Sequence, residues 1–236
     1  MLNKSMIPVC LKMLAVVAIS SYASLAQAAL VVTNGSFETP EVGVGGNTPF
    51  DPGFSAGGWT NWAGSPDENK RAFILDQATD PSYPTAQDGD QMLQLDHRGK
   101  PALVYQFLGT TDEVSDITLS AWFAARDLNV ANGIPASMTF SLLLLTGTPD
   151  SFEVLATSGP LTHSAVKTWV QHSVTAFGVA AGTPVYAGLQ ANYYMDDPVV
   201  LTVVDDVQVS TVVPEPGTVG LLALGVATIA CGRRRR

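Results

Sequence analysis

Cysteine, histidine and basic residues are scarce in this sequence. Its 236 residues include two cysteines, three histidines and 12 lysines and arginines, against 21 aspartates and glutamates. Because the two cysteines, Cys10 and Cys231, lie near opposite ends, there is no disulfide framework. Between Leu30 and Val213 only six basic residues stand against 20 acidic ones. Nucleic acid is therefore not expected as a partner, because phosphate binding needs a basic surface.

Regular helical patterns are also missing. The body contains no heptads, no sustained 3.6-residue periodicity and no repeat of about 20 to 50 residues. It has no His-Glu-x-x-His and no phosphate-binding loop, so we expect no catalytic residues. Short apolar or alternating runs are instead separated by Gly, Pro, Asn and Asp. This pattern indicates an all-β, antiparallel β-sandwich.

The expected strands fill the body of the chain. They are 30–33, 59–63, 72–75, 91–96, 102–108, 116–124, 136–145, 153–157, 168–177, 185–192 and 199–210. Two segments rich in glycine and proline, 39–58 and 79–89, are expected loops, and a loop as long as the first is usually functional or locally disordered. Because strand side chains alternate, Trp122 shares a face with hydroxyl side chains, and Asp205 shares the inward parity of Val203.

The N-terminus has the pattern of a secretory signal peptide. Two lysines precede an apolar stretch from Met13 to Ile19, and Ala26-Gln27-Ala28 supplies the small residues of a cleavage site. A permanent membrane anchor is the alternative, but the stretch is short and is followed by serines. We therefore assign residues 1–28 to the signal and expect the mature chain to begin at Ala29.

The C-terminus carries a second three-part signal. Pro214-Glu215-Pro216 is followed by an apolar run from Thr218 to Cys231 and then by Arg233, Arg234, Arg235 and Arg236. As a helix the run spans roughly 21 Å, short of the roughly 30 Å hydrocarbon core, so it tethers the body only marginally. The arginines are expected to stay in the cytoplasm. A plain tail anchor is the alternative, but it does not explain the Pro-Glu-Pro sequence beside the helix.

Residues 213–236 resemble the PEP-CTERM sorting signal of Gram-negative bacteria. The resemblance implies recognition by exosortase, a membrane transpeptidase-like enzyme, and cleavage near Pro214-Glu215-Pro216. It also implies an association with exopolysaccharide and biofilm. We then expect an exported protein of the cell envelope or extracellular matrix, transiently anchored in the inner membrane, whose membrane contact is confined to the C-terminal transmembrane helix.

A buried carboxylate needs a compensating partner. The basic residues of the body lie mostly in loop-like contexts, so a cation is the simplest compensation for an inward Asp205. Glu38, just after the first expected strand, is a second candidate carboxylate. Oxygen ligands without cysteine or paired histidine favour calcium. The alternative is that Asp205 and Asp206 cap a strand and that Glu38 is solvated.

Four short motifs are spread over the body. They are Asn34-Gly35-Ser36-Phe37-Glu38, Gly58-Trp59, Asp88-Gly89-Asp90-Gln91-Met92-Leu93-Gln94-Leu95 and Val204-Asp205-Asp206-Val207. Together they resemble the galactose-binding-like jelly roll of carbohydrate-binding modules and related secreted domains. The resemblance implies one jelly-roll domain over residues 29–212 with a structural calcium between its two ends. Its expected ligands are Glu38, Asp205, Asp206 and a carbonyl near Ser36.

Carbohydrate recognition needs apolar walls for the sugar faces and polar side chains for the hydroxyls. The candidate residues are Trp62, Trp122, Arg126, Tyr193 and Tyr194. Trp122 is favoured by its polar strand face. Core packing is an equally good interpretation of Trp62, Trp122 and Tyr194, and it is the better interpretation of Trp59, Trp169 and Tyr186.

We therefore expect a non-catalytic surface protein that binds exopolysaccharide or envelope glycan through a calcium-stabilised jelly roll. A structural matrix or adhesion protein without a defined sugar site is the first alternative. An extracellular polysaccharide hydrolase is the second, using two acidic residues such as Asp88 with Asp90 or Asp196 with Asp197.

Overall fold

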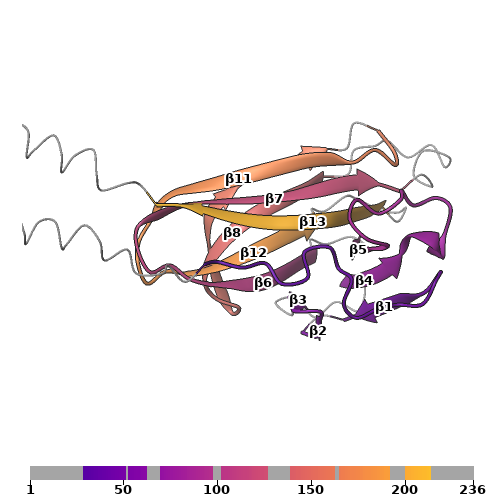
Figure 1. Ribbon diagram of the computed structural model, residues 1–236, viewed down its shortest axis with the longest axis horizontal. Helices are drawn as coiled ribbons and strands as arrows, with labels where there is room; N and C mark the ends of the chain where they lie inside the picture. The colour runs from indigo at the N-terminus through magenta and orange to yellow at the C-terminus, as the bar shows by residue number, and fades with distance from the viewer. Residues whose placement is uncertain are drawn as a thin grey trace, which may run out of the picture.

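A computed structural model describes residues 29–51, 53–62, 70–97, 102–126, 139–162, 165–191 and 200–213. Their regular structure is almost entirely β (Figure 1). The elements are β1 Asn47–Phe50, β2 Ser55–Ala56, β3 Trp59–Asn61, β4 Lys70–Asp76, the 3₁₀ turn η1 Gln77–Thr79, β5 Gln91–His97, β6 Ala102–Thr110, β7 Ser115–Ala125, β8 Thr139–Thr148, β9 Ser151–Thr157, β10 Leu161–Thr162, β11 Val170–Val179, β12 Pro184–Ala191 and β13 Val200–Val212. In the described ranges no helix has the length and apolar character to cross a membrane. Residues 1–28 and 214–236, which include the expected C-terminal helix, lie outside the described residues.

The strands form two antiparallel sheets that face each other. Sheet A has the order β1-β4-β5-β13-β7-β11, and sheet B has the order β10-β8-β12-β6-β3-β2, with β9 also paired to β8. Strands far apart in sequence are neighbours in each sheet, as in a jelly roll rather than a meander. The all-β jelly-roll sandwich predicted from the sequence is thus confirmed.

The main core lies between the sheets. Along β7 the alternate residues from Ile117 to Phe123 face inward and are fully buried. Phe123 stacks on Phe140 of sheet B with 4.1 Å between ring centroids. Trp59 is also fully buried and packs against Phe37, which confirms its assignment to the core. Burial of each such side chain contributes about 1.5 to 3 kcal/mol to folding.

A smaller apolar cluster lies on the outer face of sheet A. Met92 and Val203 belong to this cluster, and segment 77–90 covers them with Tyr83. Trp169 packs against the same cluster, and its Nε1 donates a hydrogen bond of 2.7 Å to a carbonyl of the covering segment. The loop predicted at 79–89 is therefore a packed cover rather than a free loop.

A β-bulge in β13 reverses the alternation of its side chains. Before the bulge, Asp205 pairs with Trp122 of β7, and Asp206 inside the bulge has a φ of 47°. Val204 and Val207 both face the main core although they are three positions apart. Asp205 therefore points away from the core, which corrects the inward orientation predicted from uninterrupted alternation. It is nevertheless 0% exposed, because the covering segment lies over it.

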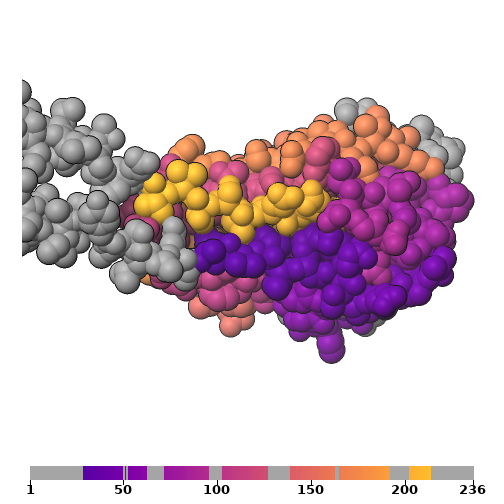
Figure 2. Space-filling view, viewed as in Figure 1, coloured from indigo at the N-terminus to yellow at the C-terminus, as the bar shows by residue number. Residues whose placement is uncertain are grey.

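The N-terminal segment 29–46 passes β13 at Gly35, and it does not form the strand predicted at 30–33. Figure 2 shows this first segment, in indigo, alongside β13, in yellow. Val207 N donates to Gly35 O, and Val31 N donates to Leu108 O, both at 3.0 Å. Because Val207 belongs to sheet A and Leu108 to sheet B, the N-terminal segment joins the two sheets.

Candidate ligand-binding site

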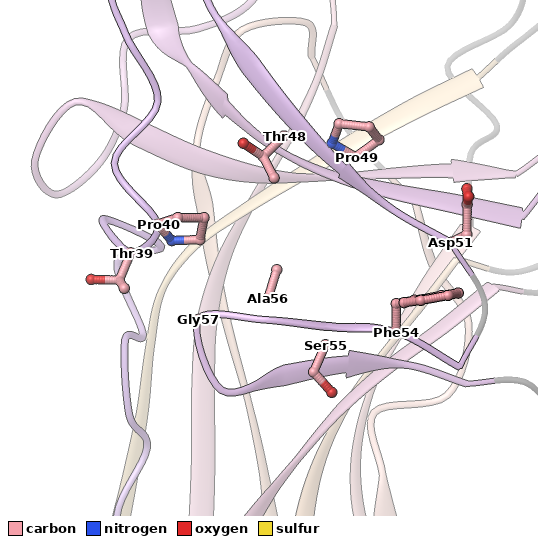
Figure 3. A pocket seen from close by; sticks show the side chains of 9 residues that line it. All are labelled: Thr39, Pro40, Thr48, Pro49, Asp51, Phe54, Ser55, Ala56 and Gly57. Atoms are coloured by element: carbon pink, nitrogen blue, oxygen red, sulfur yellow. The ribbon is translucent and has the colours of Figure 1, made fainter.

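An open hollow of about 440 Å³ lies where the edge strands of the two sheets meet. β1 is the edge of sheet A, β2 is the edge of sheet B, and the segment at Pro40 lies between them (Figure 3). The lining residues are Thr39, Pro40, Thr48, Pro49, Asp51, Phe54, Ser55, Ala56 and Gly57. The long loop predicted at 39–58 thus contains two short strands and forms this hollow.

The lining combines an exposed aromatic ring with prolines and oxygen-bearing side chains. Phe54 is 66% exposed, although phenylalanine is usually buried. Pro40 and Pro49 add apolar walls, and the rings of Pro49 and Phe54 border the same opening (Figure 3). The lining residues with oxygen-bearing side chains are Thr39, Thr48, Asp51 and Ser55, and Ser55 Oγ is hydrogen-bonded to Thr60 Oγ1 at 2.7 Å. Apolar walls with a few polar groups are typical of small-ligand sites.

Asn34 holds the rim of the hollow together. Its Nδ2 donates to Thr39 O at 2.6 Å and to Gly57 O at 3.2 Å, while its Oδ1 accepts from Thr39 N at 2.9 Å. Gly57 has a φ of 57°, and a Cβ at this position would lie 1.8 Å from Thr39 O. Only glycine allows this close approach. The first residue of the motif at 34–38 therefore positions two parts of the lining.

Asp205 holds one end of segment 87–91. Its Oδ2 accepts from Gln87 N at 2.7 Å and from Asp88 N at 3.0 Å, and its Oδ1 accepts from Asp206 N at 2.7 Å. Burial raises the pKa of Asp205 to about 7, against the opposite effect of these three donors. Backbone N–H groups thus compensate part of the cost of burying this carboxylate.

Glu38 holds the other end of the same segment. Its Oε1 accepts from Asp90 N at 2.9 Å and from Gln91 N at 2.8 Å. Gly89, with a φ of 72°, passes so close that a Cβ there would lie 2.2 Å from Glu38 Oε1. The two carboxylates expected to share an ion therefore both bind the backbone of segment 87–91.

The other two expected calcium ligands lie near these carboxylates. Ser36 is in the turn that precedes Phe37, and Asp206 Oδ1 accepts from Gln208 Nε2 at 2.7 Å. Within the described ranges no three His, Cys, Asp or Glu side chains gather as a metal-binding group. Calcium therefore stays a prediction.

The predicted carbohydrate-binding side chains do not share one site. Trp122 is half-buried on the outer face of sheet A, opposite Gln171, and its neighbours on that face are polar. Trp62 packs on the outer face of sheet B, where its Nε1 donates to Pro149 O at 2.7 Å. Tyr193 and Tyr194 lie outside the described residues.

Arg126 fastens the cover of sheet A. Its guanidinium forms an ion pair with Asp80 and lies 4.3 Å from the centre of the Tyr83 ring, and its Nε donates to Ser82 Oγ. Hydrogen bonds from Ser82, with the charge of Arg126, lower the pKa of Asp80. The side chain expected to bind sugar is thus engaged within the protein.

An aromatic group on the outer face of sheet B was missed from the sequence. Tyr186 lies 5.1 Å from Phe107 and 5.2 Å from Phe152 between ring centroids, and Tyr105 lies 5.0 Å from Phe152. Phe107 is 51% exposed. Tyr186 was assigned to the core and instead belongs to this outer group. The available signal was β6, whose side chains are apolar on both faces.

The C-terminus matches a family model described as the PEP-CTERM protein-sorting motif, over residues 212–236. The resemblance to this sorting signal is therefore confirmed, and it marks the chain for export and sorting to the cell envelope. The motif implies processing by exosortase. Among curated proteins, none matches the chain.

Solved structures share the fold at low sequence identity. A cyclase from Fischerella sp. TAU has a TM-score of 0.59 and 16% identity, and the match covers 80% of this chain and all of the cyclase. A complex of such a cyclase with 4-(1H-indol-3-yl)butan-2-one has a TM-score of 0.60, 15% identity and coverages of 80% and 99%. The CBM22-1 xylan-binding domain of Paenibacillus barcinonensis Xyn10C has a TM-score of 0.43, 17% identity and coverages of 74% and 97%. At these identities the likeness to the cyclases shows the fold alone.

Proposed function

We propose that this protein is an exported, non-catalytic envelope protein that binds carbohydrate in the hollow beside Phe54. The lining of the hollow supports this proposal. A sugar ring offers an apolar face to Phe54, Pro40 and Pro49, and it offers hydroxyl groups to the threonine and serine side chains around them. The volume of about 440 Å³ suits one or two sugar units rather than a long stretch of chain.

A neutral polysaccharide is the ligand class that the charge favours. The chain has a formal net charge of -9, and the acidic excess lies in the body. An acidic surface repels polyanions and does not repel neutral sugars. Exopolysaccharide or envelope glycan of neutral composition is therefore the proposed ligand.

Glu38 and Asp205 are not placed as the carboxyl pair of a glycoside hydrolase. Hydrolysis of a glycosidic bond needs two carboxyl groups that flank the substrate. Asp205 is 0% exposed beneath the backbone of Gln87 and Asp88, so a polysaccharide does not reach it. Glu38 is engaged by two backbone N–H groups. Neither carboxylate is placed as a general acid for an external substrate.

Calcium is proposed as a structural ion at segment 87–91. An ion there would be held by Glu38 and Asp205 through the oxygen lone pairs that the backbone donors leave, with Asp88 adding negative charge nearby. Such an ion would lower the pKa of Asp205. Its presence is therefore open to a pH test.

The substitution Phe54→Ala tests the proposed site. We expect the full chain to be retained on at least one immobilised neutral polysaccharide, and we expect Phe54→Ala to weaken this retention about tenfold or more, because the stacking ring is lost. Retention is measured by affinity electrophoresis or from a saturable binding isotherm. Thermal melting of the variant is expected to match the wild type, since an exposed side chain is removed.

Two matched variants locate the ring that binds. Phe107→Ala removes an exposed ring from the outer face of sheet B, and Trp122→Ala removes the ring on the polar face of sheet A. Both are expected to keep wild-type retention. Loss on Phe107→Ala or Trp122→Ala instead of Phe54→Ala would move the binding site to that face. No saturable retention on any polysaccharide would favour a structural matrix protein.

A further inference from the structure

The folded body continues to the very start of the sorting motif. β13 pairs with β7 as far as Val212, which lies opposite Asp116, and the motif begins at residue 212. Four residues, 214–217, separate Val213 from the apolar run that starts at Thr218. Fully extended, four residues reach about 14 Å. A protein that reads this motif must therefore work against this end of the sandwich.

Exposed apolar side chains gather at the same end. Val114 is 51% exposed, Phe177 is 79% exposed and Val212 is 63% exposed. They belong to neighbouring strands or their ends, because sheet A has the order β13-β7-β11 and Gly178 N donates to Asp116 Oδ1 at 2.8 Å. Figure 1 shows these three strands converging at the left end. We call Val114, Phe177 and Val212 the end surface.

A second hollow opens beside the end surface. Its volume is about 510 Å³, and Phe177 and the loop that follows it line one side, with Leu155 of β9 on another. Residues 177–184, from the end of β11 to the start of β12, read Phe-Gly-Val-Ala-Ala-Gly-Thr-Pro and contain no charged residue. The end surface is thus an exposed aromatic side chain next to an apolar recess, an arrangement typical of protein interfaces.

The charges around the end surface distinguish between a lipid bilayer and a protein as its partner. Asp112 and Glu113 are exposed just before Val114, and Asp116 follows it. Anionic lipid headgroups attract basic side chains and are repelled by acidic ones. The acidic rim therefore disfavours a bilayer surface and favours a protein surface with basic side chains around an apolar patch.

We propose that the end surface is a docking site for the sorting enzyme, exosortase, in addition to the motif itself. The short connection brings the enzyme to the end of the folded body, where Phe177 and the recess offer apolar contact and the acidic rim offers charge complementarity. The enzyme then reads a folded surface together with the C-terminal motif. A chain whose body is not folded lacks this second contact.

The substitution Phe177→Asp in the full chain tests the docking site. In a host that makes the sorting enzyme, conversion of the full chain to the shorter processed form is followed by pulse-chase and mass spectrometry. We expect Phe177→Asp to slow conversion about fivefold or more, the loss typical of a central interface residue. Val44→Asp is the matched control, since Val44 is 92% exposed and precedes β1 at the opposite edge of sheet A. Unchanged conversion of Phe177→Asp would overturn the proposal.

Two further measurements separate docking from folding and from lipid binding. The melting temperature of Phe177→Asp is expected to equal that of the wild type, because the side chain is exposed. The processed wild-type chain, recovered from the host, is expected not to sediment with vesicles of phosphatidylethanolamine and phosphatidylglycerol. Sedimentation that is lost on Phe177→Asp would assign the end surface to lipid and overturn docking of the enzyme.

Discussion

The carboxyl group of Asp205 is fully buried, with no exposure to solvent. Loss of hydration disfavours its ionised form, and this is the main reason that its pKa rises to about 7 from an ordinary value of 3.8. Three backbone N–H groups favour the ionised form and act in the opposite direction. One side chain thus links the stability of the covering segment to pH.

Without calcium, this carboxyl group is expected to make the protein less stable as pH rises from 4 to 7. The folded protein keeps the proton up to about pH 7, whereas the unfolded chain releases it near pH 3.8. The stabilising contribution is therefore full below about pH 4 and is lost as pH rises through 7, by roughly 1.4 kcal/mol per pH unit. The measurement is the free energy of unfolding of the wild type and of Asp205→Asn in chelator. As pH rises from 4 to 7, the variant is expected to become more stable relative to the wild type.

Bound calcium reverses the direction of this pH effect. A cation beside Asp205 favours the ionised form, so stability would then rise from pH 4 to 7 in calcium and fall in chelator. The same titration with calcium in place of chelator is the measurement. Identical curves in calcium and chelator would contradict the structural calcium predicted from the sequence.

At the scale of the strand, β13 shows which features a sequence pattern predicts well. The alternation of apolar and polar side chains located this strand within about two residues of its bounds. The bulge was not predictable from alternation, because one inserted residue reverses every later position. The available signal was the aspartate at position 206. Its φ is 47°, a left-handed conformation that aspartate adopts more readily than most residues.

The sequence predicted the segment that forms the candidate hollow but not the aromatic side chain within it. The glycine and proline content marked residues 39–58 as a loop that is either functional or locally disordered, and the hollow is formed by this segment. The choice of Phe54 needed tertiary structure, because an exposed ring differs from a core ring only in what surrounds it. Trp62 and Arg126 had the right chemistry, but Pro149 and Asp80, which lie outside the strands, engage the two side chains.

The close contact between Gly35 and the bulge of β13 predicts that a methyl group added at Gly35 lowers stability. A Cβ at Gly35 would lie 2.2 Å from Val207 O, whereas nothing lies within 4 Å of a Cβ at Gly43. Gly35→Ala is therefore expected to lower the free energy of unfolding by about 1 to 3 kcal/mol, the cost of overpacking. Gly43→Ala is expected to change it by less than about 1 kcal/mol. Urea denaturation of both variants is the test, and equal midpoints would contradict the packing described for Gly35.

For the whole molecule, the sequence predicts a signal peptide before the folded body, and the sorting motif follows the body at residues 212–236. We expect the mature protein at the cell surface to begin at Ala29 and to lack Arg233, Arg234, Arg235 and Arg236. Intact mass and terminal peptide mapping of the protein from its native host are the measurements. A surface form that retains the four arginines would contradict cleavage by the sorting enzyme.

The central place of β13 also governs the order of events during secretion. This strand is the last described one in the chain, yet it lies between β5 and β7, so sheet A remains split until it arrives (Figure 1). Pairings of such long sequence separation form late and slowly. A chain threading through the export channel N-terminus first therefore completes its sheet only when residues 200–212 have emerged. The fold is thus completed at nearly the same time as the sorting motif emerges. A translation product that stops before residue 200 has neither a complete sheet A nor the sorting motif.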